Sequence, residues 1–379
     1  MDFKDIIGQD FLKNYFQKII SQKRVPHTQL FVGEEGTGTL PMALAFAREF
    51  LCGSGENCQH KVDKFIHPDL HFIFPNITRD NLRKPQSDDF IGEWRSFLTE
   101  NPYGSLHDWH AHLNVANKQG EIRVTDAESL SKKVSIKPYE ADYKVFIIWM
   151  AEKMNLKTAN KLLKILEEPP EDTKFILIAR KTDDILDTIL SRAQIHHFNP
   201  VPVKSIQNKL KELFQLDEQS ALKIAHQSNG DWNKALKLAQ NNNSDDEFQK
   251  LFINWVRIAF SAKQNRQAIR KLIEWSEDLA TRGRENQKYF LNFALQTFRQ
   301  ALAINYQNPD LAYFDFSAHG FDLHKLAPFI HSNNIIEIYE SINDAIYHIE
   351  RNANPKIIFL DLSIKLTKLI HKKEKIHNV

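Results

Sequence analysis

Residues 26–51 read PHTQLFVGEEGTGTLPMALAFAREFL and decide the fold, because an apolar strand runs into a glycine-rich turn and then into a helix. The run from Leu30 to Val32 is apolar and ends at Gly33, and the segment from Pro41 is alanine-rich with helical spacing of its apolar residues. A strand, a glycine turn and a helix in this order are typical of folds that bind phosphate at a helix N-terminus. The sequence therefore predicts a P-loop-type α/β domain.

Four further short apolar runs predict strands, and helical patterns separate most of them. Strands that alternate with helices predict a parallel sheet that is covered on both faces. Between the second and third strands, segment 76–120 is polar, and we expect it to be an irregular insertion on the rim of the sheet. The four predicted strands are 70–74, 145–149, 175–179 and 195–198.

The strand signals largely stop at the double-proline segment 199–202, which predicts a domain boundary. Short helices follow up to the polar run 240–246, and longer helical patterns continue to the end of the chain. We therefore expect three domains: an α/β domain over 1–200, a small helical lid over 201–242 and an all-α domain over 243–379.

The charge of the chain is nearly balanced, with 50 basic and 48 acidic residues and a formal net charge of +2. Such a balance argues against a protein that grips nucleic acid alone through a dominating positive field. No stretch approaches the roughly 18 apolar residues of a membrane span, and the first residues lack a signal-peptide pattern. The expected location is the cytoplasm, without membrane contact.

The glycine turn departs from the phosphate-loop pattern at its two reactive positions. Gly33, Gly36 and Gly38 supply the turn, but Thr39 and Leu40 stand where the pattern G-x-x-x-x-G-K-[ST] places lysine and a hydroxyl residue. The missing lysine would neutralise phosphate charge, and the missing hydroxyl would bind magnesium. No productive ATP binding is expected at this loop; the alternative is a simple strand-to-helix turn.

The third strand lacks the acidic residues that hold magnesium and polarise water in a working NTPase. Trp149 and Met150 follow the apolar run, and only Glu152 remains nearby. Losses at two places distant in the sequence indicate a retained scaffold without nucleotide chemistry.

A more specific pattern lies downstream, where residues 160–170 read NKLLKILEEPP and Ser191-Arg192 follow the next strand. Together with His67-Pro68-Asp69, these motifs resemble bacterial clamp-loader AAA+ subunits over residues 1–240. The resemblance implies an AAA+ fold in which the all-α domain forms a collar for hetero-oligomeric assembly. It also implies the partners: ATPase motor subunits and the delta subunit, the sliding clamp indirectly, and primed DNA within the complex.

The chain resembles the branch of that family whose own ATP site is degenerate, because this condition is found at Thr39, Leu40, Trp149 and Met150. The resemblance implies that Arg192, with Ser191, acts as an arginine finger at a neighbour's ATP site. The chain would then be a non-hydrolysing stator without intrinsic ATPase activity. A surface arginine in an ordinary salt bridge is the simpler alternative for Arg192.

Two other functions stay open: an ATP-hydrolysing motor subunit of the same complex, and a DNA- or metal-binding adaptor on an AAA+ fold. Thr39 and Leu40 argue against the motor subunit. The near-neutral charge argues against the adaptor.

The family resemblance also implies a four-cysteine zinc module after the phosphate-loop helix. Cys52 and Cys58 occupy two of its places, but Lys61 and Lys64 occupy the other two, and an ammonium group cannot bind zinc. His60 or His67 could supply a nitrogen ligand instead. We expect a remnant module with free thiols, no bound metal and no cofactor.

Three weaker features have plain structural interpretations. The spacing of His107, His110 and His112 resembles a metal site but is expected in a solvated loop. Asn233 and Lys234 lie where active AAA+ members carry a sensor arginine, yet the simpler interpretation is an exposed helix start capped by Asp231 or its neighbours. The basic residues before the third strand suggest a DNA- or clamp-facing surface or merely a solvated face; they are Lys132, Lys133 and Lys137.

Overall fold

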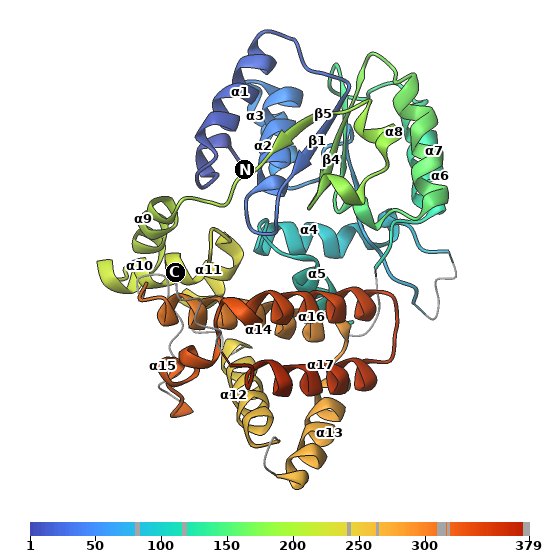
Figure 1. The fold of residues 1–379 in the computed structure, drawn as a ribbon. Helices are drawn as coiled ribbons and strands as arrows, with labels where there is room; N and C mark the ends of the chain where they lie inside the picture. The colour runs from blue at the N-terminus through green and yellow to red at the C-terminus, as the bar shows by residue number, and fades with distance from the viewer. Residues whose placement is uncertain are drawn as a thin grey trace. The chain divides into compact units, whose positions relative to one another are not determined.

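A computed structural model describes residues 1–79, 84–115, 120–240, 244–262, 265–308, 316 and 319–373. The chain divides into two compact units, Met1–Gln240 and Asn241–Val379 (Figure 1). The first unit contains the sheet, and the second is helical. The expected fold class, a parallel α/β sheet followed by helices, is confirmed. The finer division of residues 1–242 into an α/β domain and a lid stays a prediction.

The sheet has five parallel strands in the order β2-β3-β4-β1-β5. All predicted strands are present, with ends shifted by at most two residues. The first strand lies between β4 and β5. The turn that follows it therefore lies at the carboxyl-terminal edge of the sheet, between two neighbouring strands. The strands are β1 (Thr28–Val32), β2 (Leu70–Ile73), β3 (Lys144–Ile148), β4 (Thr173–Ala179) and β5 (Gln194–His197).

Successive strand residues point to opposite faces of the sheet, so each strand supplies two cores. Phe31 packs with the cluster on one face, and Leu30 and Val32 pack with the cluster on the other. Figure 1 shows one group of helices on each side. The first face carries α1 (Asp10–Ser21), α2 (Thr39–Cys52) and α3 (Glu56–Asp63), and the second carries α6 (Val124–Val134) and α7 (Leu156–Glu167).

The prediction of an irregular insertion over 76–120 is wrong for its described residues. Two helices, α4 (Ile91–Glu100) and α5 (Leu106–His112), bury Trp94 and Trp109 completely in the first core. The two indoles meet edge to face with ring centroids 5.2 Å apart. The polar residues between the aromatic positions conceal a helical spacing, and burial of the aromatic side chains stabilises both helices.

Three short helices end the first unit and share a small core of their own. This core contains Ile206, Leu210 and Trp232, and it also includes Ile7 and Tyr103 from the α/β part. The helices are α9 (Val203–Phe214), α10 (Glu218–Gln227) and α11 (Trp232–Ala239). The small helical segment is therefore packed onto the α/β part through shared apolar contacts.

The second unit is a helical bundle with an aromatic centre. Trp255 and Trp275 stack with centroids 5.1 Å apart, and the Trp255 indole donates a hydrogen bond of 2.8 Å to Ser363. Across the described helices, none combines the length and apolarity that a membrane span requires. The helices are α12 (Ser244–Ala262), α13 (Arg266–Ala280), α14 (Arg284–Asn305), α15 (Leu323–Leu326), α16 (Ser332–Glu350) and α17 (Pro355–Leu369).

Candidate functional site

The glycine turn lies between β1 and α2, as expected. The amide of Gly33 donates to the carbonyl of Ala179 on β4, which continues the sheet into the turn. Gly38 has a φ of 96°, a left-handed conformation that favours glycine, and it immediately precedes the first residue of α2. Thr39 and Leu40, which replace the lysine and hydroxyl residues, are buried.

The cavity at this turn is small. Its volume is about 20 Å³, whereas cavities that enclose ligands of nucleotide size usually measure about 300–1,000 Å³. All seven residues predicted for the degenerate site line it, together with Tyr103 and Arg180. The seven are Gly33, Gly36, Gly38, Thr39, Leu40, Trp149 and Met150.

The start of α11 closes the turn from the other side. The amide of Trp232 donates a 3.1 Å hydrogen bond to the carbonyl of Gly36. Gly36 has a φ of 73°, and a Cβ added there would overlap the Oδ1 atom of Asp231. Asp231 also caps α11, as expected, by accepting a hydrogen bond from the Lys234 amide. An ionised Asp231 carboxylate at this place would repel a phosphate group.

The beginning of α11 is held against α5, so the predicted exposed helix face is wrong. Asn233 is buried and donates to the Oδ2 atom of Asp108 at 2.6 Å, and Lys237 Nζ lies 2.6 Å from Oδ1. Asn101 donates to Asn233 at 2.7 Å. Burial disfavours ionised Asp108, but the hydrogen bond from His107 and the Lys237 charge hold its pKa well below the usual value. We name these contacts of Asp108, Asn233 and Lys237 the α11 anchor.

The buried carboxyl group of Asp231 should make the stability of the fold depend on pH in an unusual way. Burial raises its pKa to about 7, from 3.8 in an exposed carboxyl group. The folded chain therefore holds this proton more tightly than the unfolded chain does. The resulting stabilisation of the fold is fully present below pH 3.8 and is lost as the pH rises towards about 7.

We expect Asp231→Asn, which keeps a capping side chain, to remove this loss. Between pH 4 and 7, the stability of the variant relative to wild type should rise by about 3 kcal/mol, measured by thermal melting. Asp217→Asn is the matched control, because Asp217 caps α10 through hydrogen bonds that lower its pKa. The expectation is contradicted if the melting temperatures of wild type and Asp231→Asn change with pH in the same way.

At the end of β3, an aromatic side chain stands where an NTPase carries its magnesium carboxylates. Trp149 is buried, and its ring centroid lies 5.1 Å from that of Trp94 and 6.1 Å from that of Phe97. Met150 follows in a left-handed conformation with a φ of 56°. Trp149 thus packs in the aromatic core and also lines the phosphate-loop cavity, and its side chain offers no oxygen ligand to a metal ion.

Glu152, the carboxylate that follows β3 in the sequence, faces a cation of the same chain. Its Oε1 atom lies 3.7 Å from the Nε atom of Arg180, and its side chain is only 6% exposed. Burial raises the pKa of Glu152, which further weakens it as a magnesium ligand.

Arg192 follows the short helix α8 (Asp187–Leu190), and its side chain is 34% exposed. Its guanidinium donates to the carbonyl of Thr188 at 2.8 Å and to Glu167 at 3.0 Å. The neighbouring Ser191 hydroxyl also donates to Thr188 and accepts a hydrogen bond from Arg192. Arg180, not Arg192, lines the chain's own phosphate-loop cavity.

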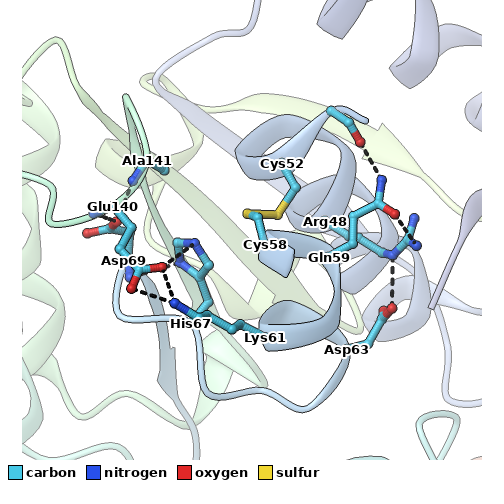
Figure 2. Close-up of a disulfide and its surroundings, with 11 residues drawn as sticks. Arg48, Cys52, Cys58, Gln59, Lys61, Asp63, His67, Asp69, Glu140 and Ala141 are labelled. Atoms are coloured by element: carbon cyan, nitrogen blue, oxygen red, sulfur yellow. Dashed lines mark hydrogen bonds and ion pairs between the residues drawn. A yellow bond between two sulfur atoms is a disulfide. The ribbon is translucent and has the colours of Figure 1, made fainter. Parts of the chain in front are cut away.

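The prediction of free thiols is wrong, because Cys52 and Cys58 form a disulfide (Figure 2). Cys52 ends α2 and Cys58 lies in α3, and the turn through Gly53 and Gly55 brings their Cα atoms to 5.4 Å. This distance suits a disulfide. Sequence spacing alone did not indicate that the turn folds back so tightly.

The surroundings of the disulfide do not fit a structural zinc site. His67 brings a ring nitrogen within 4.8 Å of both sulfur atoms, whereas His60 does not join the group. Zinc binds thiolates, and the two sulfur atoms are joined in a disulfide. Even as thiolates they would make only three ligands with His67, and structural zinc almost always takes four. Lys61, which stands where the family resemblance implies a zinc ligand, pairs with Glu140 at 2.6 Å (Figure 2).

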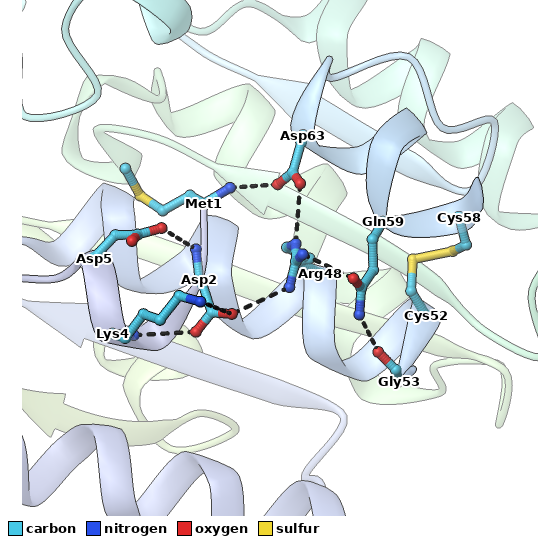
Figure 3. Close-up of polar contacts among 10 residues, drawn as sticks. All are labelled: Met1, Asp2, Lys4, Asp5, Arg48, Cys52, Gly53, Cys58, Gln59 and Asp63. Atoms are coloured by element: carbon cyan, nitrogen blue, oxygen red, sulfur yellow. Dashed lines mark hydrogen bonds and ion pairs between the residues drawn. A yellow bond between two sulfur atoms is a disulfide. The ribbon is translucent and has the colours of Figure 1, made fainter. Parts of the chain in front are cut away.

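A polar cluster beside the disulfide ties α2, α3 and the chain start together (Figure 3). Arg48 reaches Asp63 at 3.1 Å, Gln59 at 2.8 Å and Asp2 at 3.5 Å, and the amino group of Met1 also contacts Asp63. Because Arg48 and Gln59 come from different helices, the disulfide and this cluster stabilise the same corner.

The motif His67-Pro68-Asp69 has a structural explanation. The buried Asp69 carboxylate accepts hydrogen bonds from the amides of Tyr139, Glu140 and Ala141 at 2.6–2.9 Å. Burial opposes ionisation, but these three amides lower the pKa of Asp69. The motif thus fixes the loop that leads into β3.

The remaining sequence candidates do not converge on a site. His107, His110 and His112 lie in α5 rather than in the predicted solvated loop, and His110 is buried. Lys133 pairs with Asp88 at 2.6 Å. Lys132 and Lys137 are exposed, so a DNA- or clamp-facing role for them stays a prediction.

Comparisons with known proteins agree with the resemblance. DNA polymerase III subunit delta′ of Bacillus subtilis (strain 168) is 30% identical over 200 residues, covering 51% of this chain and 48% of that protein. Subunit tau of the same organism is 28% identical over 242 residues, covering 62% of this chain and 37% of tau. The chain thus spans about half the length of delta′ and a smaller share of tau.

Among solved structures, a gamma subunit-related protein from Thermotoga maritima aligns with 94% of this chain and 99% of its own, at a TM-score of 0.41 and 15% identity. The clamp loader delta protein of Bacillus subtilis aligns with 95% of this chain and 99% of its own, at a TM-score of 0.34 and 12% identity.

A family model described as "DNA polymerase III, delta subunit" matches residues 8–202. This match covers the whole sheet, the altered phosphate loop and the Ser191-Arg192 pair. It also covers just over half of the 379 residues, and the chain therefore belongs to the DNA polymerase III delta subunit family.

Proposed function

We propose that this chain is a delta′-type, non-hydrolysing subunit of the DNA polymerase III clamp loader. In this role it stays rigid while ATPase subunits of the complex work, and it lends Arg192 to the ATP site of a neighbour. The observation that carries the proposal is a contrast between two sites. The chain's own phosphate loop is closed by its own side chains, whereas Arg192 is exposed outside that loop.

The α11 anchor supports a rigid role. In an active AAA+ subunit, according to the family resemblance, this segment carries a sensor arginine that touches the nucleotide. Here Asp231 and Trp232 contact the phosphate loop directly, and Asp108 binds Asn233 and Lys237. These contacts fix the helix without a nucleotide.

Arg192 suits a role in trans on chemical grounds. A guanidinium offers several donors in a planar fork that matches phosphate oxygens. In other NTPases, such a group supplied by a neighbour stabilises the charge that develops on the transferred phosphoryl group. A neighbouring ATPase subunit is therefore the partner we propose on this side of the chain.

The helical unit carries a surface that supports a collar role. Ile336, Tyr339 and Tyr347 lie on one face of α16 and are 51–64% exposed, whereas Ile338 and Ile342 face the bundle core. An apolar stripe opposite the buried face favours packing against another helix. We propose that the other clamp-loader subunits cover it, in a cytoplasmic complex that acts on the sliding clamp and primed DNA.

Co-expression with the motor and delta subunits of the same organism tests the proposal. We expect one stable complex that contains this chain and loads a sliding clamp onto primed DNA, and the isolated chain should show no magnesium-dependent ATP binding in a titration. Tight ATP binding by the isolated chain would favour a motor subunit instead. Failure to co-purify with any of these subunits would contradict the assignment.

A further inference from the structure

The side chain of Arg192 is already held in one orientation within the isolated chain. One terminal nitrogen, Nη1, donates to the carbonyl of Thr188 at 2.8 Å and to the Ser191 hydroxyl at 3.2 Å. The other, Nη2, lies 3.0 Å from the Oε1 atom of Glu167. Both ends of the guanidinium fork are therefore anchored to different elements.

Glu167 is placed for this contact by the way its helix ends. It is the last residue of α7, Glu168 has already left the helical conformation, and Pro169 and Pro170 prevent the helix from continuing. A carboxylate at a helix C-terminus faces the negative end of the helix dipole and is unfavourable unless a cation compensates it. Arg192 supplies that cation, so the two groups stabilise each other.

The anchored guanidinium still has donors to offer. Of its five N–H groups, three serve Thr188, Ser191 and Glu167. The Nε group and the second N–H of Nη2 meet no acceptor within the described part of the chain. A phosphate oxygen from outside the chain can therefore bind Arg192 while the contact with Glu167 persists.

We propose that Glu167 is a positioning residue for Arg192, and this inference rests on the proposed role of Arg192 in a neighbour's ATP site. A free arginine side chain loses much rotational entropy when it binds. The contact with Glu167 restricts the side chain beforehand, so less entropy is lost as the neighbour's site approaches its transition state. Glu167 acts through Arg192 and does not itself touch the nucleotide.

The test uses the assembled complex with Glu167→Gln in this chain, and its readout is DNA-stimulated ATP hydrolysis. The neutral amide keeps the size of the side chain but loses the charge. We expect the kcat of the complex to fall about threefold to fivefold, as for loss of one partly exposed ion pair, with the KM for ATP unchanged within twofold. Because salt screens such a pair, the difference should shrink at high ionic strength.

Glu168→Gln is the matched control, since Glu168 is the adjacent exposed carboxylate, and it should leave the rate unchanged. A second control combines Glu167→Gln with Arg192→Ala, where the Glu167 substitution should have no further effect. The proposal is overturned if Glu167→Gln leaves kcat unchanged or raises it, if Glu168→Gln lowers it equally, or if the effect persists without Arg192.

The Arg192→Ala variant distinguishes failure of the proposed function from failure of the positioning role. If Arg192→Ala itself leaves the rate unchanged, Arg192 is no finger, and the positioning role of Glu167 falls with it. If Arg192→Ala lowers the rate strongly and Glu167→Gln does not lower it, only the positioning role is overturned.

Discussion

Arg192→Ala is expected to lower ATP hydrolysis at the neighbouring site of the assembled complex by about 10³-fold or more, the range for arginine fingers in other NTPases. The alanine removes the donors that would stabilise the phosphoryl group in its transition state. Its loss should not unfold the chain, because the side chain is partly exposed and its contacts lie at the surface. The measurement is ATP turnover of the complex with clamp and primed DNA, at saturating ATP.

Two further variants make this result specific. Arg192→Lys keeps the charge but loses the planar fork, so it should restore only a small part of the rate. Arg24→Ala removes another exposed arginine and should leave the rate and the assembly unchanged. A normal DNA-stimulated rate in a complex that contains Arg192→Ala would contradict the proposed role.

The sheet was predictable from the sequence because its strands are buried on both faces. Such strands appear as short, nearly continuous apolar runs, for example Leu30-Phe31-Val32, and helices separate them along the chain. The departure from the phosphate-loop pattern is also visible in the sequence, because it depends on residue types at fixed positions of a known pattern. Thr39, Leu40 and Trp149 depart from that pattern in the sequence itself.

The closure of the site could not be predicted in the same way. The contact between Asp231 and Gly36 joins residues almost 200 positions apart, and a lone aspartate before a helix predicts only a cap. Asp108 was likewise concealed in a polar segment, where its histidine neighbours suggested solvent. A weak signal did exist, because Asn233 and Lys237 are spaced four residues apart and so share one face of α11.

The disulfide illustrates a different limit. Two cysteines separated by five residues predict a bond only if the backbone between them reverses, and the residues Gly53-Ser54-Gly55 permit that reversal without requiring it. The resemblance to a zinc module predicted free thiols instead. The geometry of the turn, rather than the residue types, decides whether the two cysteines form a disulfide.

Placing a carboxylate at the end of β3 is expected to destabilise the first unit strongly rather than to create a magnesium site. In Trp149→Asp, the large ring is removed from contact with Trp94 and Phe97, and a carboxylate takes its place in an aromatic core. Removing a buried tryptophan alone costs about 3–5 kcal/mol, and burying an unpaired carboxylate adds to that cost. Since whole domains are stable by about 5–15 kcal/mol, much of the stability would be lost.

Trp149→Phe separates the loss of packing from the buried charge, because it keeps an aromatic ring and should cost only about 1–2 kcal/mol. Hydrogen exchange of the sheet amides in the full chain distinguishes the variants: exchange should accelerate strongly in Trp149→Asp and modestly in Trp149→Phe. Adding Thr39→Lys to Trp149→Asp should not restore ATP binding, because Asp231 still closes the loop and the aromatic core is disrupted. The prediction is contradicted if that double variant binds ATP in a magnesium-dependent way while its sheet amides remain protected from hydrogen exchange. In that case Trp149 would not be needed for the core, and Asp231 would not close the loop to nucleotide.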